Sequence, residues 1–256
     1  MKLVDSHCHL DLPPLAEEYE AVLARAEKLG VQGCLIPAVQ RGHWSGLERR
    51  SNLPKVAVAI GLHPCFAHRQ TDLDAMAQRL QSPHPYVAIG ECGLDKVSGV
   101  LPMAEQVSLC EAQLGLARRH ELPIILHVRQ AHNELLALLK RHPPSAGGVI
   151  HAFSGSPELA KQYLRHGLKL GIGGVITYPR AAKTRNTVAQ LPADSLLLET
   201  DSPDMPLEGF QGQANEPARL PRVLSELARL RSVSENALCE QILNNTRSLF
   251  PRWHGL

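Results

Sequence analysis

The sequence predicts an α/β fold of the TIM (β/α)8 type with an additional C-terminal helix. Eight short apolar or β-branched runs alternate with segments of helical periodicity, an order typical of parallel strands joined by crossovers. Residues 56–60 and 124–126 are continuously apolar, as expected of strands covered on both faces. An open doubly wound sheet would have a glycine-rich turn after its first strand, whereas here that strand ends in histidines. We therefore expect residues 1–256 to form one barrel.

The predicted elements follow one another at short intervals. The strands are residues 3–5, 33–39, 56–61, 86–91, 123–128, 148–153, 168–173 and 195–201. Apolar residues spaced by three and four predict helices around Leu15–Leu29, 107–117, 135–139 and 220–227. The polar segment 206–217 reads as a loop after the eighth strand. A last helical pattern, at Ala237, Leu238, Ile242 and Leu243, is expected to pack outside the barrel as an appendage.

Composition restricts the setting and the partners. Hydrophobic residues make up 44% of the chain, enough for a large core, and the formal net charge is only +2. This charge is too small for a protein that holds nucleic acid mainly by counterion release, so contact with a polyanion should be local. The six cysteines include no C-x-x-C pair, and no apolar run has the length of a membrane span. We expect a soluble, cytoplasmic protein with reduced thiols, no membrane association and no obligate protein partner.

Metal-ligand residue types occur at the ends of five predicted strands. They are His7 and His9, Glu91, His127, His151 and Asp201. Each histidine alone could be a buried structural residue, but a carboxylate that ends an apolar strand must meet a cation, a donor or a metal. The C-terminal ends of barrel strands converge on one mouth. The set therefore predicts a metal centre there.

Six ligands exceed what one tetrahedral zinc ion takes, so we expect two divalent ions. Glu91, from a middle strand, is the expected bridge. His7, His9 and Asp201 would hold one ion, and His127 and His151 the other. Zinc, manganese and magnesium all remain candidates. Such a pair of ions activates water for hydrolysis.

With these residues in place, the chain resembles the TatD family of metal-dependent deoxyribonucleases in the amidohydrolase superfamily, most closely its YjjV-type members. The resemblance covers nearly the whole chain. Its motifs are Asp5-Ser6-His7-Cys8-His9-Leu10-Asp11, Gly61-Leu62-His63-Pro64, Gly90-Glu91-Cys92-Gly93-Leu94-Asp95, Leu126-His127-Val128-Arg129, His151-Ala152-Phe153-Ser154-Gly155, Leu198-Glu199-Thr200-Asp201-Ser202-Pro203 and Asn215-Glu216-Pro217.

The resemblance implies a TIM barrel, a two-metal centre and hydrolysis of phosphodiester bonds in DNA, with the ligand roles on the six residues named above. Glu91 stands where many amidohydrolases carry a carbamylated lysine. Three departures affect the mouth: Lys96 replaces a frequent aromatic residue, Ala152 follows His151, and the segment 177–180 is altered. Substrate identity is therefore less firmly implied than catalysis.

Catalytic roles are assigned to Glu91, as the bridge, and to Asp201, which is also expected to accept a proton from the attacking water. His63 either contacts the substrate phosphate or leaving group, or caps a backbone group in its loop. Arg129 either binds phosphate or forms a salt bridge that holds its loop. Glu199 is expected to pair with a base inside the barrel or to orient a ligand histidine.

The expected substrate is DNA or another nucleotide phosphodiester. A basic cluster of Arg180, Lys183 and Arg185 either binds phosphate or is a solvated helix face. Aromatic residues make up only 4% of the chain, and Phe153, Tyr178 and Trp44 are the few candidates for base stacking. The alternatives are a hydrolase of a small-molecule amide, lactone or phosphoester, which the same barrel can support, and a non-catalytic metal- or nucleic-acid-binding protein.

Overall fold

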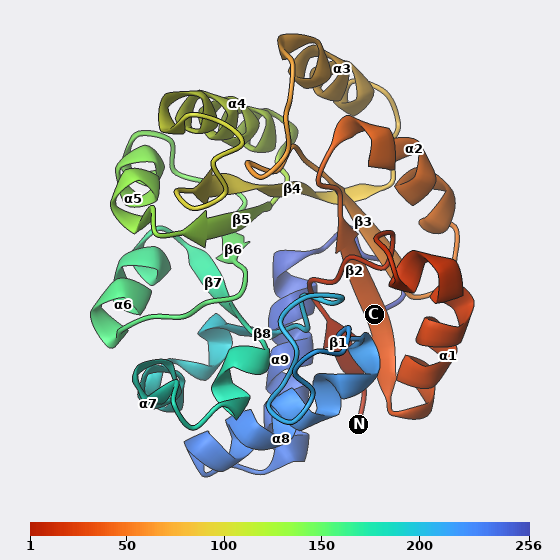
Figure 1. The fold of residues 1–256 in the computed structure, drawn as a ribbon, viewed down its shortest axis with the longest axis vertical. Coiled ribbons are helices and arrows are strands. Elements are labelled where there is room, and N and C mark those ends of the chain that lie inside the picture. Colours follow the sequence, from red (N-terminus) through yellow and green to blue (C-terminus); the bar gives the residue numbers. More distant parts are fainter.

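A computed structural model describes residues 1–256 and contains eight parallel strands in one sheet, in the order of the sequence. The strands lie at the centre and the helices form a ring around them (Figure 1). The TIM-barrel prediction is confirmed. The strands are β1 (Leu3–Asp5), β2 (Val31–Pro37), β3 (Val56–Ile60), β4 (Tyr86–Asp95), β5 (Ile124–Arg129), β6 (Gly148–Ile150), β7 (Leu168–Ile172) and β8 (Leu196–Leu198).

Each strand is followed by at least one helix. The helices are α1 (Tyr19–Lys28), α2 (Arg41–Arg50), α3 (Gln70–Leu80), α4 (Met103–His120), α5 (His132–Arg141), α6 (Pro157–Arg165), α7 (Ala182–Gln190), α8 (Leu220–Arg231) and α9 (Glu235–Leu249). Short 3-10 turns occupy Leu15–Glu18, Gly174–Thr177, Ala193–Ser195 and Pro217–Arg219. Local sequence sets some boundaries: Ser156, with Pro157 at the first helical position, caps α6 by accepting from the Leu159 N–H. No helix has both the length and the apolar character needed to cross a bilayer.

Closure of the barrel joins β1 to β8 just beyond the strands themselves. The Ser6 N–H donates to the Leu198 carbonyl at 2.9 Å, and the Asp201 N–H donates to the His7 carbonyl at 2.9 Å. Thr200 strengthens the seam, because its backbone N–H and its hydroxyl donate to the two oxygens of Asp5 at 3.0 and 2.6 Å. The seam therefore fixes the residues that follow β1 relative to those that follow β8.

The C-terminal helix packs outside the barrel through Leu238 and Ile242, as expected, whereas the chain at and beyond its end closes the barrel floor. Leu249, Phe250 and Trp253, at and beyond the end of α9, join a buried cluster with inward-facing residues of seven strands. Figure 1 shows α9 behind β8 and β1. The strand residues in this cluster are Val4, Leu35, Ala57, Ala59, Val87, Ala88, Ile125, Val149 and Leu197. Several of them are small, so the large C-terminal side chains fill the space that alanines leave.

Three strand ends differ from their predicted positions by three or four residues. β4 continues four residues past Glu91 to Asp95, whereas β6 ends at Ile150 and β8 at Leu198. His151 and Asp201 therefore lie in the loops after their strands. A loop position allows backbone conformations that a strand forbids: Asp201 has a φ of +57° and Ala152 of +48°. All six cysteines are unpaired.

Candidate metal centre

One oxygen of the Glu91 carboxylate faces the residues that follow β1 and β8. Glu91 Oε2 lies 3.1 Å from His7 Nε2 and 3.2 Å from His9 Nε2. Asp201 Oδ1 lies 3.4 Å from His7 Nε2 and 3.8 Å from His9 Nε2. The two imidazole nitrogens are themselves 3.2 Å apart. We call His7, His9 and Asp201 the seam group, since the bonds that close the barrel position all three.

The other oxygen of Glu91 faces three histidines, which come from β5 and from the loops after β3 and β6. Glu91 Oε1 lies 2.7 Å from His151 Nε2, 3.0 Å from His63 Nε2 and 3.3 Å from His127 Nδ1. His127 Nδ1 and His151 Nε2 are 3.0 Å apart. We call His63, His127 and His151 the mouth group, because His127 is the most exposed side chain of the centre, at 18%. Glu91 thus lies between two groups of nitrogen and oxygen donors.

The backbone explains why Glu91 reaches the centre of the barrel. Its N–H donates at 3.0 Å to the carbonyl of Ala38, in the segment after β2, so a segment two strands away in the sheet holds its main chain. Gly61 permits the close approach, since a Cβ at that position would lie 2.3 Å from the Gly90 carbonyl carbon. The side chain of Glu91 is only 2% exposed. A buried carboxylate in this position requires compensating positive charge.

The charges around Glu91 are strongly coupled. Burial acts to raise its pKa, but His151, His63 and His7 outweigh burial and hold the pKa of Glu91 well below its usual range. Burial lowers the pKa of His7 to about 3, helped by the nearby His151. Burial also opposes charge on His9, yet its hydrogen bond to Glu91 raises the pKa of His9 to about 9. The site accordingly keeps an ionised carboxylate among neutral and charged imidazoles.

The donor set fits divalent ions. The Nδ1 atoms of His7, His9 and His151 are buried without a hydrogen-bond partner, while their Nε2 atoms converge on Glu91. Neutral imidazole nitrogens and carboxylate oxygens that meet at one point are typical ligands of zinc and manganese. All six predicted ligands, distributed from residue 7 to residue 201, are brought together. Which ions bind, and how many, stays a prediction.

The sequence interpretation missed Asp95. Its Oδ2 lies 3.0 Å from His127 Nε2, on the side of the ring opposite Glu91. Ending the fourth strand at Glu91 hid this residue. The available signal was the two-residue period of a strand, which places Glu91 and Asp95, four residues apart on β4, on the same face.

The residues expected to contact substrate divide into free and engaged side chains. Arg129, at the end of β5, is exposed and its side chain forms no hydrogen bond or ion pair, so the expected loop salt bridge is absent. Arg180 is also exposed and stacks on Tyr178, with its Cζ 4.8 Å from the ring centroid. Lys183 is exposed on α7. In contrast, Arg185 is paired with Glu226 at 2.6 Å.

Two of the proposed stacking residues belong to the core. Phe153 is 1% exposed and Trp44 is fully buried, with its indole N–H donating to the Gly61 carbonyl. Glu199 is also fully buried, and burial raises its pKa well above the usual value. It forms no pair with Lys or Arg; it accepts from the Ala152 N–H and lies 3.9 Å from His151 Nδ1. Its position next to His151 agrees with an orienting role.

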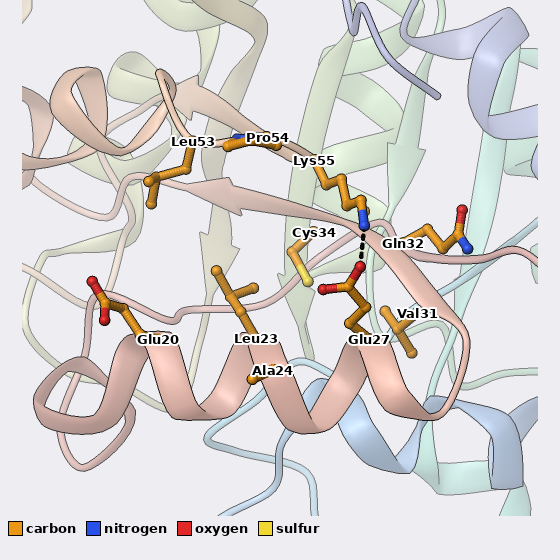
Figure 2. A pocket seen from close by; sticks show the side chains of 11 residues that line it. Glu20, Leu23, Ala24, Glu27, Val31, Gln32, Cys34, Leu53, Pro54 and Lys55 are labelled. Carbon is orange, nitrogen blue, oxygen red and sulfur yellow. Dashed lines mark hydrogen bonds and ion pairs between the residues drawn. The ribbon is translucent and has the colours of Figure 1, made fainter.

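A separate cavity of about 460 Å³ lies on the outer flank of the barrel (Figure 2). It lies between α1 and the segments around β2 and β3, and an ion pair between Lys55 and Glu27 crosses it. None of its lining residues belongs to the metal centre. The centre lies instead at and just beyond the C-terminal ends of the strands, as this fold predicts.

Comparisons with known proteins agree with the fold and with a metal-dependent hydrolase. A family model described as TatD related DNase matches residues 4–251. YjjV of Escherichia coli K12, named an uncharacterized metal-dependent hydrolase, is 43% identical over 97% of this chain and 98% of its own. Its crystal structure matches with a TM-score of 0.94 over the same shares of the two chains.

Two further comparisons support different kinds of conclusion. A Pantoea vagans protein named 3'-5' ssDNA/RNA exonuclease TatD is 33% identical over 97% of this chain and 99% of its own. A variant of the organophosphorus hydrolase from Deinococcus radiodurans has a TM-score of 0.63 at 16% identity, covering 97% of this chain and 92% of its own. At that identity the similarity concerns the fold alone.

Proposed function

Because the chain belongs to the TatD related DNase family and is a metal-dependent hydrolase, we propose that it cleaves phosphodiester bonds in DNA with the help of two divalent ions. One observation carries the proposal: the two oxygens of Glu91 face two different groups of ligands. Oε2 faces His7 and His9, and Oε1 faces His127 and His151. A carboxylate so placed is a natural bridge between two ions.

The seam group of His7, His9 and Asp201 would hold one ion, and His127 and His151 the other, with Glu91 shared. When bound, such ions lower the pKa of a coordinated water and offset charge that develops on the phosphoryl oxygens. The protein supplies the ligands in a fixed, largely buried arrangement. Little reorganisation of the protein is therefore needed when substrate binds.

Asp201 is placed to accept the proton that the attacking water releases. Its side chain is 14% exposed, and burial raises its pKa above the usual range, which makes the carboxylate a better base. Its backbone is fixed at a φ of +57° by the hydrogen bond to His7. Its Oδ1 lies 3.4 Å from His7 Nε2, so the carboxylate faces the centre.

His63 is placed to donate a hydrogen bond. Its Nδ1 accepts from the Cys65 N–H at 3.1 Å, so its Nε2 carries the proton and faces Glu91 Oε1. A proton-bearing nitrogen is unsuited to bind a metal ion, but it can contact a phosphoryl oxygen or the leaving oxygen. His63 therefore caps a backbone group in its loop, as one of the two alternatives expected. We propose that its Nε2 in addition contacts the reacting groups.

Two observations support a nucleic acid as substrate. A relative at 33% identity is named a 3'-5' ssDNA/RNA exonuclease. In this chain, Arg129 lies at the end of β5 and Arg180 follows β7. Both side chains are exposed and have no acidic partner, as a contact with phosphate requires. A small-molecule amide, lactone or phosphoester is the second candidate. It is favoured by the engagement of Arg185 with Glu226 and by the burial of Phe153, which remove two expected nucleic-acid contacts.

A substrate comparison tests the proposal. The purified protein, loaded separately with zinc, manganese or magnesium, would be given end-labelled single-stranded DNA, the same sequence as RNA, a phosphomonoester, a lactone and an amide. We expect shortening of the DNA that disappears on chelation and returns with metal. Cleavage of the lactone or amide with no change in any oligonucleotide would contradict the nuclease and support the small-molecule alternative.

A further inference from the structure

The four predicted histidine ligands differ in what their second ring nitrogen contacts. His7, His9 and His151 have a buried Nδ1 without any hydrogen-bond partner. His127 is turned the other way: its Nδ1 faces Glu91, and its Nε2 lies 3.0 Å from Asp95 Oδ2. It is also the most exposed of the four, at 18%. Packing, with Glu199 at 3.9 Å from the Nδ1 of His151, can hold the three buried rings, whereas the exposed ring has a carboxylate within hydrogen-bond distance to hold it.

Asp95 is itself rigidly fixed. Its Oδ1 accepts from the N–H groups of Val97 and Ser98 at 2.7 and 2.9 Å. Gln106 of α4 holds its backbone on both sides, accepting from the Asp95 N–H at 2.7 Å and donating to its carbonyl at 2.9 Å. These four hydrogen bonds hold the Asp95 carboxylate in a fixed position, with Oδ2 directed at His127 Nε2.

A carboxylate oxygen at Nε2 accepts a hydrogen bond and so keeps a proton on that nitrogen. The Nδ1 of His127, which lies 3.3 Å from Glu91 Oε1 and 3.0 Å from His151 Nε2, then has the free lone pair that an ion would need. His63, whose ring faces the same Glu91 oxygen, is in the reverse state, because the Cys65 N–H donates to its Nδ1. His63 and His127, whose ring centroids are 4.5 Å apart, are thus held in opposite tautomers.

We propose that Asp95 is a positioning residue that fixes the tautomer of His127 and so makes His127, and not His63, the metal ligand of the mouth group. The inference rests on the two-ion centre proposed above and adds a reason why one histidine of the mouth group binds an ion and another does not. Asp95 touches neither substrate nor ion. It acts through the imidazole of His127.

The substitution Asp95→Asn is unusually informative because the surroundings dictate how the amide must lie. Val97 and Ser98 present two N–H donors to one oxygen, so the amide oxygen must stay on that side. The NH2 group then faces His127 Nε2 and donates to it, which moves the ring proton to Nδ1. A protonated Nδ1 cannot bind an ion. The volume of the side chain is unchanged, so the tautomer is what the variant alters.

Zinc titration and ¹⁵N NMR of the histidine rings test the proposal. In the zinc-loaded wild type we expect two ions per chain and a His127 ring with its proton on Nε2. In Asp95→Asn we expect one ion at wild-type affinity and the other weakened by about 10- to 100-fold. Unchanged affinity for both ions would overturn the proposal. A His127 proton on Nδ1 in the wild type would also overturn it, and this measurement needs no variant.

Two control variants separate the tautomer from general damage. Asp11→Asn makes the same chemical change at another buried carboxylate that pairs with a histidine, His43 Nδ1 at 2.6 Å. Cys65→Ala removes the thiol that lies 3.4 Å from Asp95 Oδ2 but keeps the backbone N–H that serves His63. Both should keep two ions. Loss of the ion assigned to His127 and His151 from Asp11→Asn would contradict the proposal, because Asp11 pairs with His43 and lies two residues from the seam ligand His9.

The result is separable from failure of the proposed function. A wild-type protein that binds two ions but cleaves no phosphodiester contradicts the nuclease and leaves the role of Asp95 intact. A wild type that binds a single ion contradicts the two-ion centre, and the NMR tautomer of His127 still decides the role of Asp95.

Discussion

The seam group and the mouth group present similar donors to the two oxygens of Glu91, but the molecule holds them in different ways. His7 and His9 follow one strand, are 0% and 8% exposed, and are fixed by the bonds that close the barrel. His63 and His127 come from separate strands, and side-chain or loop hydrogen bonds fix their rings. Close packing fixes the orientation of the buried histidine rings, and hydrogen bonds fix the orientation of the rings that are closer to water. We therefore expect changes in the two groups to have different consequences.

The largest effect is expected from Glu91→Gln, which removes the charge that both groups share. Because an amide is a poor bridge between two cations, both ions should be lost and turnover should fall by about 10,000-fold, equivalent to about 5.5 kcal/mol. Elemental analysis and the substrate assay measure this. Loss of only one ion would show that the two groups do not depend equally on Glu91.

Asp201→Asn tests the seam group. We expect turnover to fall by roughly 100- to 10,000-fold, the range for removal of a general base. The imidazoles of His7 and His9 and the carboxylate of Glu91 remain, so the seam ion should bind more weakly and still be measurable. Full activity with a normal metal load would exclude the assigned role of Asp201.

His63→Asn tests the mouth group at a residue that is not a predicted ligand. Both ions should stay bound, and turnover should drop by about 100-fold, as for loss of one preorganised donor to a developing oxyanion. Metal content measured beside turnover separates the two effects. A lost ion with His63→Asn would instead make His63 a ligand.

Thr200→Val acts on the seam without touching a predicted ligand. It removes the hydroxyl that donates to Asp5 at 2.6 Å and leaves a fully buried carboxylate with one donor fewer. We expect the free energy of unfolding to fall by about 1–3 kcal/mol. Chemical denaturation measures this, with Ser154→Ala as a control for loss of a hydroxyl elsewhere. An unchanged stability would show that backbone bonds alone hold the seam.

The smallest effect is expected from Arg129→Ala, since this side chain is exposed and has no protein partner. KM for an oligonucleotide should rise by about threefold, with kcat unchanged and a weaker dependence on salt. Arg141→Ala, an exposed arginine at the end of α5, is the control. Equal effects of the two variants would argue against a phosphate contact at Arg129.

The strand pattern and the positions of the ligand types could be predicted from the sequence, because both depend on short-range periodicity. His7 and His9 are two residues apart on an extended segment, so they share a face whatever the rest of the chain does. The ends of parallel strands in a barrel meet at one mouth, so Glu91, His127 and Asp201 could be assigned to the same centre without coordinates. These inferences need only the order of the elements.

Other features depend on contacts that no local pattern records. The continuation of β4 to Asp95, the tautomers of His63 and His127, and the closure of the barrel floor by Phe250 and Trp253 belong to this class. Most of them rest on a hydrogen bond or packing contact between residues distant in the sequence, for which the sequence offers several equally suitable partners. The tautomer of His63 rests on the Cys65 N–H two residues away, a bond that the residue types alone do not reveal. The sequence by itself thus determined the barrel and its metal-binding residue types. The tertiary structure decided which Glu91 oxygen faces which histidine, because that depends on the closure of the ring between β1 and β8.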